Sequence, residues 1–521
     1  MSLLRKKPLE QVVREAGDPN LQEHGHDAVA GGLKRSLGAF HLAMLGVGAI
    51  IGAGIFSLTG TAAAQYAGPG IVYSFVLGGV LCAFAGLCYA ELASMIPVAG
   101  SAYAYTYTTM GELVAWIVGW DLILEYAFGA VTVSVAWSGY VYSLVHDSLG
   151  MTLPDWMVRF TQGPWEHVTL ADGSQVSGIW NLPATFVALA ATFVLYRGIK
   201  EAAWVNNLIV VVKVAIVLIF IALGIGVISE ANLVADPSGT GLGALVPPVQ
   251  SVIDHGREVS RYGWGMGGVL TGAGVVFFAY IGFDAVSTTA QETRNPSRDL
   301  PIGILTSLFV CTLLYVGVAI VLTGVVPYRE LDVAEPIALG IDRIVEMRGW
   351  EPGAQKLFTA TIKFGAIAGL TSVILVMILG QTRVFYAIAR DGLLPWFGKT
   401  HPKFHTPHIG TSVTGVFIAL CAGVMPIHIV GELVSIGTLL AFVVVCIGVP
   451  LLRRTEPDHP RAFAVRWPNA IGIAGALACL WVMIGLPWDT WLRLLVWLLI
   501  GFTIYFTYGR KHSKLGQNVA S

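Results

Sequence analysis

The chain has little charge for its length. Only 12% of its 521 residues are Asp, Glu, Lys or Arg, whereas an average soluble domain has about 25%. The 31 basic and 32 acidic residues nearly balance, and no basic stripe of the kind that binds nucleic acid is present. The motifs H-E-x-x-H and G-x-S-x-G are also absent, which argues against a metalloprotease or serine hydrolase within the membrane. We therefore expect neither a nucleic-acid partner nor an enzyme.

Cysteines are few, and all of them lie inside apolar runs. None has the spacing of a metal site such as C-x-x-C, so we expect small packing residues and neither a metal nor another cofactor. The cysteines are Cys82, Cys88, Cys311, Cys421, Cys446 and Cys479.

Residues 1–38 are polar and lack the apolar core of a signal peptide.

Apolar residues and glycine are abundant. The chain is 55% hydrophobic, contains 61 glycines and has a mean hydropathy of +0.71. An apolar helix needs about 20 residues to cross a bilayer, and twelve windows of that kind predict an all-α polytopic membrane protein with 12 transmembrane helices. The windows lie near 40–64, 70–96, 112–143, 180–196, 205–228, 267–289, 302–325, 357–380, 409–426, 431–452, 471–487 and 490–508.

Orientation follows from the positions of the basic residues. Most of the 31 lysines and arginines fall in segments that are cytoplasmic if the N-terminus is inside, and cytoplasmic loops are the ones enriched in such residues. Both termini are therefore predicted to be cytoplasmic. The longest loops, 145–179 and 229–266, are then outside and are too short for a domain, although they could form caps or short helices.

Two of the spans are interrupted by glycine. The first contains Gly46, Gly48, Gly52 and Gly54. The sixth contains Gly282 and, two residues later, Asp284. A broken helix in lipid leaves backbone groups that need a ligand, water or another helix. Half-helix N-termini suit a carboxylate and half-helix C-termini suit a cation. Two breaks five spans apart are what two inverted five-helix repeats would give; the alternative is that these glycines only allow close helix packing.

Lys213 lies in the middle of the fifth span, too deep to reach the interface. A buried lysine must lose its proton or find oxygen partners. One hypothesis places its ammonium against the unwound part of span 1. The other is a structural ion pair with Asp284, Glu125 or Glu91.

Acidic residues also lie within the apolar spans, where they are costly and usually functional. Asp284 follows the break in span 6 and could carry a proton, contact a cationic substrate or cap the second half-helix. Asp121 and Glu125 lie one turn apart on span 3, and the deeper Glu125 is the better candidate. Glu91 is interpreted as structural, and Lys363 is expected to snorkel at the outer end of span 8.

Four ordered motifs resemble a known family. They are GVGAIIGAGIF (46–56), CYAELASMIPVAGSAYAYTY (88–107), FFAYIGFDAVSTTAQETRNPSRDLPIGI (277–304) and GQTRVFYAIARDGLLP (380–395). They are similar to hallmarks of the amino acid–polyamine–organocation superfamily, and most of all to the bacterial form of its cationic amino acid transporter branch. The resemblance covers about residues 34–512.

This resemblance implies a LeuT-like fold with a 5+5 inverted repeat plus two helices. The implied organisation is an N-terminal tail (1–38), a ten-helix transport core (39–453), two further helices with the preceding loop (454–508) and a C-terminal tail (509–521). It also implies that the α-carboxylate of an amino acid binds N–H groups of the span 1 break and that the α-amino group binds carbonyls of the span 6 break. The matching positions are Ile50, Gly52, Ala53 and Gly54 in the first break and Phe278, Ala279 and Ile281 in the second.

The resemblance further implies proton coupling through Lys213, because proton-coupled members have a lysine where sodium-coupled relatives bind an ion. Glu125 and Asp284 are the accompanying candidates. Some relatives have threonine or serine at the position of Ala53, so a hydroxyl contact is missing here while the backbone contact remains.

The chain differs from some family members in two features that concern partner subunits. Members that pair with a single-pass glycoprotein have a cysteine after span 3, and residues 145–179 contain none. No N-x-S/T glycosylation acceptor is present either. We therefore expect a bacterial plasma-membrane protein with no disulfide-linked subunit; a small single-span partner stays open.

The leading hypothesis is a permease that imports L-amino acids with a proton. Glu125 and Asp284 could serve a cationic side chain, or they could carry protons and leave an apolar pocket for small neutral substrates, which we slightly favour. An obligate exchanger and a sensor of the same fold that does not transport are the alternatives.

Overall fold

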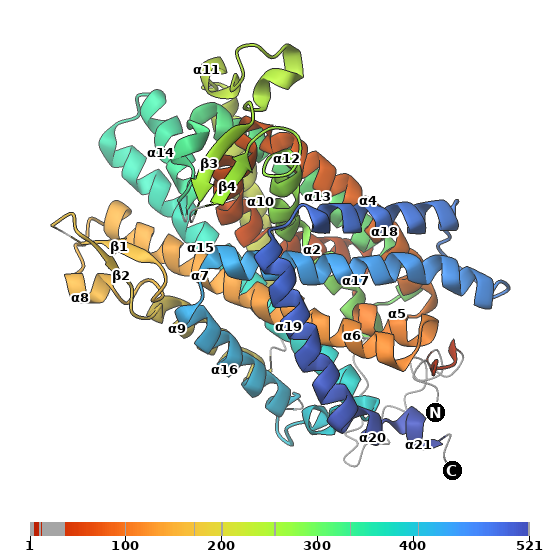
Figure 1. The fold of residues 1–521 in the computed structure, drawn as a ribbon. Helices are drawn as coiled ribbons and strands as arrows, with labels where there is room; N and C mark the ends of the chain where they lie inside the picture. The colour runs from red at the N-terminus through yellow and green to blue at the C-terminus, as the bar shows by residue number, and fades with distance from the viewer. Residues whose placement is uncertain are drawn as a thin grey trace.

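The computed structural model describes residues 5–9, 12, 37–98, 100–170, 172–198, 202–254, 257–333, 335–404 and 406–518. Most of the expected N-terminal tail (1–38) lies outside these residues. Of these described residues 75% are helical, and their helices form one elongated bundle (Figure 1).

The membrane-crossing character of the bundle is plain from the length and composition of its helices. Three shorter apolar helices are α9 (Leu182–Arg197), α16 (His408–Val424) and α18 (Pro468–Ile484). Within the described ranges, eight further apolar runs are long enough to cross a bilayer: Ala39–Met95, Glu112–His146, Asn207–Ile225, Val269–Ala290, Pro296–Val325, Pro352–Arg390, Ile427–Thr455 and Trp488–His512. The expectation of a polytopic membrane protein built of apolar helices is thereby confirmed.

The long runs are built from the following helices. They are α2 (Ala39–Ile50), α3 (Thr59–Ala62), α4 (Ile71–Met95), α6 (Glu112–Ile123), α7 (Gly129–Ser143), α10 (Ala202–Ile225), α12 (Val269–Val276), α13 (Pro296–Val325), α15 (Pro352–Arg390), α17 (Ile427–Thr455), α19 (Trp488–Ile504) and α20 (Arg510–His512). The other helices are α5 (Ser101–Thr109), α8 (Asp155–Val158), α11 (Glu230–Leu233), α14 (Pro336–Met347) and α21 (Lys514–Asn518).

Both long loops contain a β-hairpin, which the sequence analysis did not expect. The first pairs β1 (His167–Thr169) with β2 (Gln175–Ser177), and the second pairs β3 (Gln250–Asp254) with β4 (Arg257–Arg261). The first turn contains Asp172 and Gly173, with Gly173 at φ +81°, a residue pair that favours hairpins. Hydrogen bonds from the hydroxyl and N–H of Ser174 lower the pKa of Asp172.

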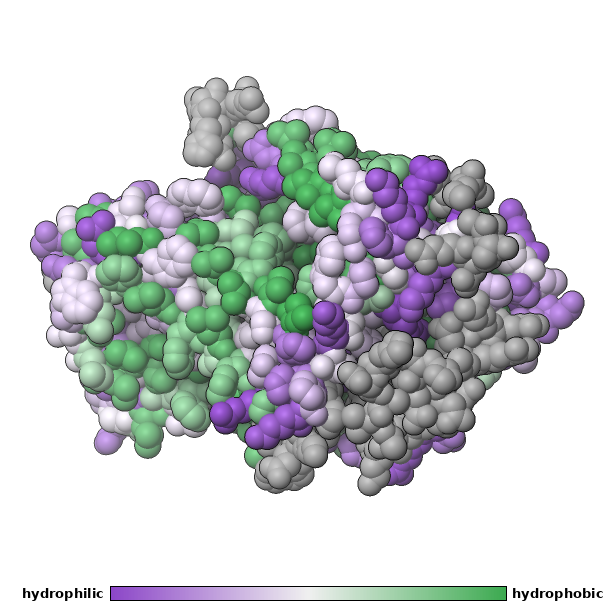
Figure 2. Space-filling view, turned by 90° about the horizontal axis from the view of Figure 1, so that it is seen from below, coloured by the Kyte–Doolittle hydropathy of each residue, from purple (hydrophilic) through white to green (hydrophobic). Residues whose placement is uncertain are grey.

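The helices pack so that the interrupted segments are enclosed. Helix α13 lies along α2 and α4, α15 lies along α7 and α10, and α17 packs against α18 and the middle of span 3. The peripheral helices α18 and α19 expose large apolar side chains, among them Leu477, Trp481, Trp488 and Leu499, as lipid-facing helices do. Figure 2 shows hydrophobic residues over much of one face and hydrophilic residues toward one end.

Both expected breaks are present. Helix α2 ends at Ile50, the backbone at Ile51 is extended, and a π-helical segment begins at Gly54. Span 6 changes from α12 to a 3₁₀ turn (Phe277–Tyr280) and resumes as a 3₁₀ helix (Asp284–Glu292). Span 3 is also irregular, because the π-helical segment Leu124–Phe128 separates α6 from α7, a feature often found at functional sites.

Candidate substrate and coupling site

The two broken helices touch each other at their breaks. A Cβ atom on Gly54 would overlap the backbone of Ala279, and one on Gly282 would lie about 2.9 Å from Ala49. Gly282 also has φ +116°, a conformation that glycine adopts without strain and other residues do not. Glycine at these positions therefore lets the backbones of spans 1 and 6 meet.

The predicted carboxylate-binding residues lie on both sides of the break in span 1. Ala53 precedes the π-helical segment and Gly54 opens it, so their N–H groups belong to a helix N-terminus, where such groups have no partner within the helix. Gly52 accepts a hydrogen bond from Phe56 N–H at 3.2 Å. Ile50 is the last residue of α2, and its carbonyl oxygen is 2.8 Å from the Tyr315 hydroxyl.

The predicted amino-group-binding residues lie at the end of the first half of span 6. Phe278 and Ala279 belong to the 3₁₀ turn, and Ile281 follows it in an extended conformation. The Phe278 carbonyl accepts a hydrogen bond from Ile281 N–H at 3.2 Å, and the Ala279 carbonyl is 2.8 Å from the Tyr315 hydroxyl. Since a carbonyl oxygen has two lone pairs, these contacts leave acceptor capacity at the break.

Two tyrosines that the sequence analysis missed hold the breaks. Tyr315 on α13 places its hydroxyl between the carbonyls of Ile50 and Ala279. Tyr140 on α7 donates a hydrogen bond to the Phe56 carbonyl at 2.8 Å. A tyrosine within an apolar span needs a partner for its hydroxyl, and this was the available signal.

Lys213 lies against the break in span 1. Its side chain is 0% exposed, and its Nζ donates hydrogen bonds to the carbonyls of Gly48 at 2.6 Å and Ile51 at 3.0 Å. This is the arrangement of the first hypothesis above, with backbone oxygens as partners. Gly369 on α15 leaves room for the lysine stem, because a Cβ there would collide with it.

Glu125 and Asp284 are brought together by the irregular parts of spans 3 and 6. Both are fully buried and are immediate neighbours. Asp284 accepts a hydrogen bond from the Tyr126 hydroxyl at 2.5 Å and a longer one from Ser101 at 3.4 Å. Ser101 starts α5 at φ +50°, a strained conformation of the kind found at functional sites. Tyr126 directly follows Glu125, and this adjacency was a usable signal.

Asp284 stands in the first turn of the helix that follows the break. The residue preceding that helix is Phe283, which makes no side-chain cap. The Asp284 carboxylate accepts a hydrogen bond from the Tyr126 hydroxyl on span 3, and its capping of the half-helix stays a prediction.

Two further charged residues lie away from the breaks. Glu91 binds Arg453 at 2.7 Å and lies 3.6 Å from Arg461, so its structural interpretation is confirmed. Lys363 is 1% exposed, and its Nζ is 3.5 Å from the Ser143 carbonyl. The expectation that Lys363 snorkels is wrong, because neighbouring helices enclose it at that depth.

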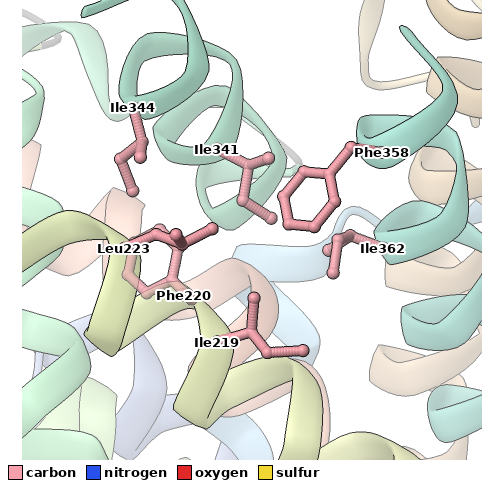
Figure 3. Close-up of a pocket in the computed structure, with 7 residues that line it drawn as sticks. All are labelled: Ile219, Phe220, Leu223, Ile341, Ile344, Phe358 and Ile362. Atoms are coloured by element: carbon pink, nitrogen blue, oxygen red, sulfur yellow. The ribbon is translucent and has the colours of Figure 1, made fainter. Parts of the chain in front are cut away.

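A small apolar cavity, but no cluster of metal-ligating side chains, is present in the part of the chain that the structure describes. Among the described residues, no three His, Cys, Asp or Glu side chains converge as metal ligands. A cavity of about 10 Å³ lies between α10, α14 and α15 (Figure 3), away from the breaks. Its lining is apolar. The cavity has room for about one water molecule, but it offers that water no hydrogen-bond partner. Its lining residues are Ile219, Phe220, Leu223, Ile341, Ile344, Phe358 and Ile362.

Comparison with known proteins shows the family of the chain. Residues 37–508 match the family model described as amino acid permease. The branched-chain amino acid permease BcaP of Bacillus subtilis is 45% identical over 93% of this chain and 95% of its own length. The methylthioribose transporter of the same organism is 39% identical over 99% and 100%. Cationic amino acid transporter 9 of Arabidopsis thaliana is 36% identical over 84% and 70%.

The matched region contains both broken helices, Lys213 and the Glu125–Asp284 pair. These relatives move small molecules across membranes and are not enzymes. The chain therefore belongs to the amino acid permease family of the amino acid–polyamine–organocation superfamily and is an integral membrane amino acid transporter.

Proposed function

We propose that this protein imports neutral L-amino acids together with a proton across the bacterial plasma membrane. The observation that supports the proposal most strongly is the position of the Lys213 ammonium on the carbonyls of Gly48 and Ile51. These carbonyls lie where α2 gives way to the break. Loss of the proton from Lys213 would weaken both hydrogen bonds, so protonation would be linked to the shape of the break.

The proposed architecture has twelve spans. The run Ala39–Met95 has 57 residues, about 85 Å if straight, so it accounts for two spans. Together with the seven other long runs and the three short helices it gives twelve. In this proposal residues 39–453 form two inverted five-helix repeats, 454–508 add two spans, and both termini, including the tails 1–38 and 509–521, are cytoplasmic.

In this proposal, the backbone of the two breaks binds the groups that all amino acids share. N–H groups of Ala53 and Gly54 would hold the α-carboxylate, as helix N-termini do for anions. Carbonyls of Phe278, Ala279 and Ile281 would hold the α-ammonium group. Side-chain selectivity then depends on what lies beyond the breaks.

A neutral side chain fits the polar neighbours better than a cationic one. The Asp284 carboxylate already accepts from Tyr126 and Ser101, and two adjacent buried carboxyl groups favour a shared proton over two negative charges. We therefore assign Glu125 and Asp284 to proton carriage. BcaP is named for branched-chain amino acids, and leucine, valine and alanine are the substrates that we expect here.

Uptake into proteoliposomes tests the proposal. We expect an inward proton gradient to raise leucine and alanine uptake at least tenfold, with no competition by arginine. Arginine uptake would instead assign Glu125 and Asp284 to a cationic side chain. Methylthioribose belongs in the competitor panel because it lacks both groups that the breaks would bind.

The Lys213→Ala variant tests the coupling. It should lose the stimulation by the gradient, whereas Lys356→Ala, an exposed lysine on α15, should keep it. Unimpaired stimulation in Lys213→Ala would remove that residue from the mechanism. Counterflow without net uptake by the unmodified protein would show an obligate exchanger, and binding without any transport would show a sensor.

A further inference from the structure

Asp121 is a buried acid to which the proposed function assigns no role. It lies on α6, four residues before Glu125, and its side chain is 0% exposed. Neither of its carboxyl oxygens has a hydrogen-bond partner within the described structure. A buried polar group without a partner is costly, so the group must be satisfied by a proton, by water or by both in turn.

Helix α17 approaches Asp121 closely at a glycine. A Cβ on Gly437 would lie 3.2 Å from the Asp121 Oδ1 atom, so the carboxyl group faces the bare backbone of α17 at that glycine. The next residue, Thr438, lies beside Glu125. Asp121, Thr438 and Glu125 therefore line one seam between span 3 and α17.

The polar atoms of this seam lack hydrogen-bond partners among the described residues. The Thr438 hydroxyl is fully buried, and it and both Glu125 oxygens have no hydrogen-bond partner in the described structure. Buried waters in proteins are found where several such groups meet. The buried Thr438 hydroxyl beside Glu125 is a second indication, besides the acids themselves, that water enters the seam.

Glu125 connects Asp121 to the rest of the site. It is the neighbour of both Asp121 and Asp284, so the three carboxyl groups form a row. Three tyrosines lie at the Asp284 end of this row: Tyr89 on α4, Tyr105 on α5 and Tyr126 on span 3 itself. Asp121 lies about 6 Å nearer than Glu125 to the N-terminal end of span 3, which is cytoplasmic in the proposed orientation.

We propose that Asp121 is a second proton-carrying group, which takes the coupled proton from the Glu125–Asp284 pair and releases it toward the cytoplasm. This inference rests on the proposed proton symport. In each transfer the O–H bond of the Glu125 carboxyl breaks and an O–H bond forms on the Asp121 carboxylate, through water in the seam. Asp121 then returns its proton to water on the cytoplasmic side and becomes a carboxylate again.

Two transport modes separate this role from a structural one. Net uptake driven by a proton gradient requires that the proton leave the carrier inside, whereas counterflow of labelled against unlabelled leucine does not. We expect Asp121→Asn to lower gradient-driven leucine uptake at least tenfold and to leave counterflow within about twofold of the unmodified protein. Asp121→Glu, which keeps a proton-carrying group, should recover much of the net uptake.

The matched control is Thr132→Val. Thr132 is buried on the same span, and its hydroxyl donates to the Phe128 carbonyl on that span at 3.0 Å, so this variant should retain both modes. Unchanged net uptake in Asp121→Asn would overturn the proposal. A parallel loss of net uptake and counterflow in both Asp121 variants would also overturn it, because it would indicate a packing role.

Measurements on the unmodified protein show whether the role of Asp121 or the proposed proton symport is wrong. If the unmodified protein shows no stimulation by the gradient, proton symport itself is wrong. If it does show stimulation and Asp121→Asn shows the same stimulation, only the role of Asp121 is wrong.

Discussion

Gly54 illustrates how one absent side chain determines the site. It opens the second half of span 1, and the backbone of Ala279 from span 6 occupies the space that a Cβ would need. Protein interiors are close-packed, so such an overlap is relieved only by moving one backbone. Moving either would separate the N–H groups of one break from the carbonyls of the other.

We therefore expect Gly54→Ala to lower leucine uptake at least tenfold. Because the overlap involves backbone atoms, rotation of a flexible side chain cannot relieve it. The measurement is the initial rate of uptake into proteoliposomes at equal amounts of folded protein.

The control for this substitution is Gly129→Ala on span 3. A Cβ there meets only the Met377 sulfur at 3.6 Å, an ordinary contact, and alanine favours a helix by up to about 1 kcal/mol over glycine. Gly129→Ala should therefore transport normally. Equal rates for both variants would refute the close contact of the two breaks.

At the scale of elements, one carboxylate ties two spans and a loop together. Glu91 near the end of α4 accepts two hydrogen bonds from Arg453 near the end of α17, at 2.7 and 2.9 Å. It also accepts one from the N–H of Val465, in the loop before α18, at 2.8 Å. The carboxylate is 2% exposed, so its charge depends on these partners.

Glu91→Gln should destabilise the protein by about 2–3 kcal/mol, because it leaves Arg453 without its counter-charge in a mostly buried position. Thermal unfolding in detergent would show this as a lower melting temperature. Arg343→Ala is the comparison: its pairs with Glu330 and Glu346 are exposed and contribute less than about 1 kcal/mol. A melting temperature of Glu91→Gln equal to that of Arg343→Ala would contradict this account.

At the scale of the whole molecule, both chain ends dock at the same end of the bundle (Figure 1). Lys7 binds Asp391 at 3.0 Å, and the N–H of Lys514 donates to the Asp391 carbonyl at 3.1 Å. The Arg5 carbonyl accepts from Glu112 N–H at 2.9 Å. The hairpin of β3 and β4 lies at the other end of the bundle in the same view.

The proposed orientation predicts opposite accessibility for these two ends. A cysteine at Ser238, in the loop before β3, should react with a membrane-impermeant maleimide on intact cells. A cysteine at Lys514 should react only after permeabilisation. Both positions are exposed, and five of the six native cysteines are buried, so background labelling should be low. The reverse pattern would invert the topology.

The sequence by itself determined the class of protein and the places where its helices break. Apolar windows of about 20 residues and clustered glycines are local properties, because each helix satisfies its own backbone in lipid and each break is visible where glycine interrupts it. Lys213, Glu125 and Asp284 stood out for the same reason, as charges within apolar runs. The π-helical segment in the middle of span 3 could not be predicted in this way, because no particular amino-acid composition marks a π-helix.

Only the tertiary structure decided which of these groups meet. Lys213 reaches Gly48 and Ile51 across more than 160 residues of sequence, and the local sequence could not choose between those carbonyls and an acidic partner. Tyr315, Tyr140 and Ser101 acquire their partners in the same way, from other helices. Hydrogen bonding and close packing act over a few ångströms in space, so the roles of these residues depend on how the helices are arranged around the two breaks.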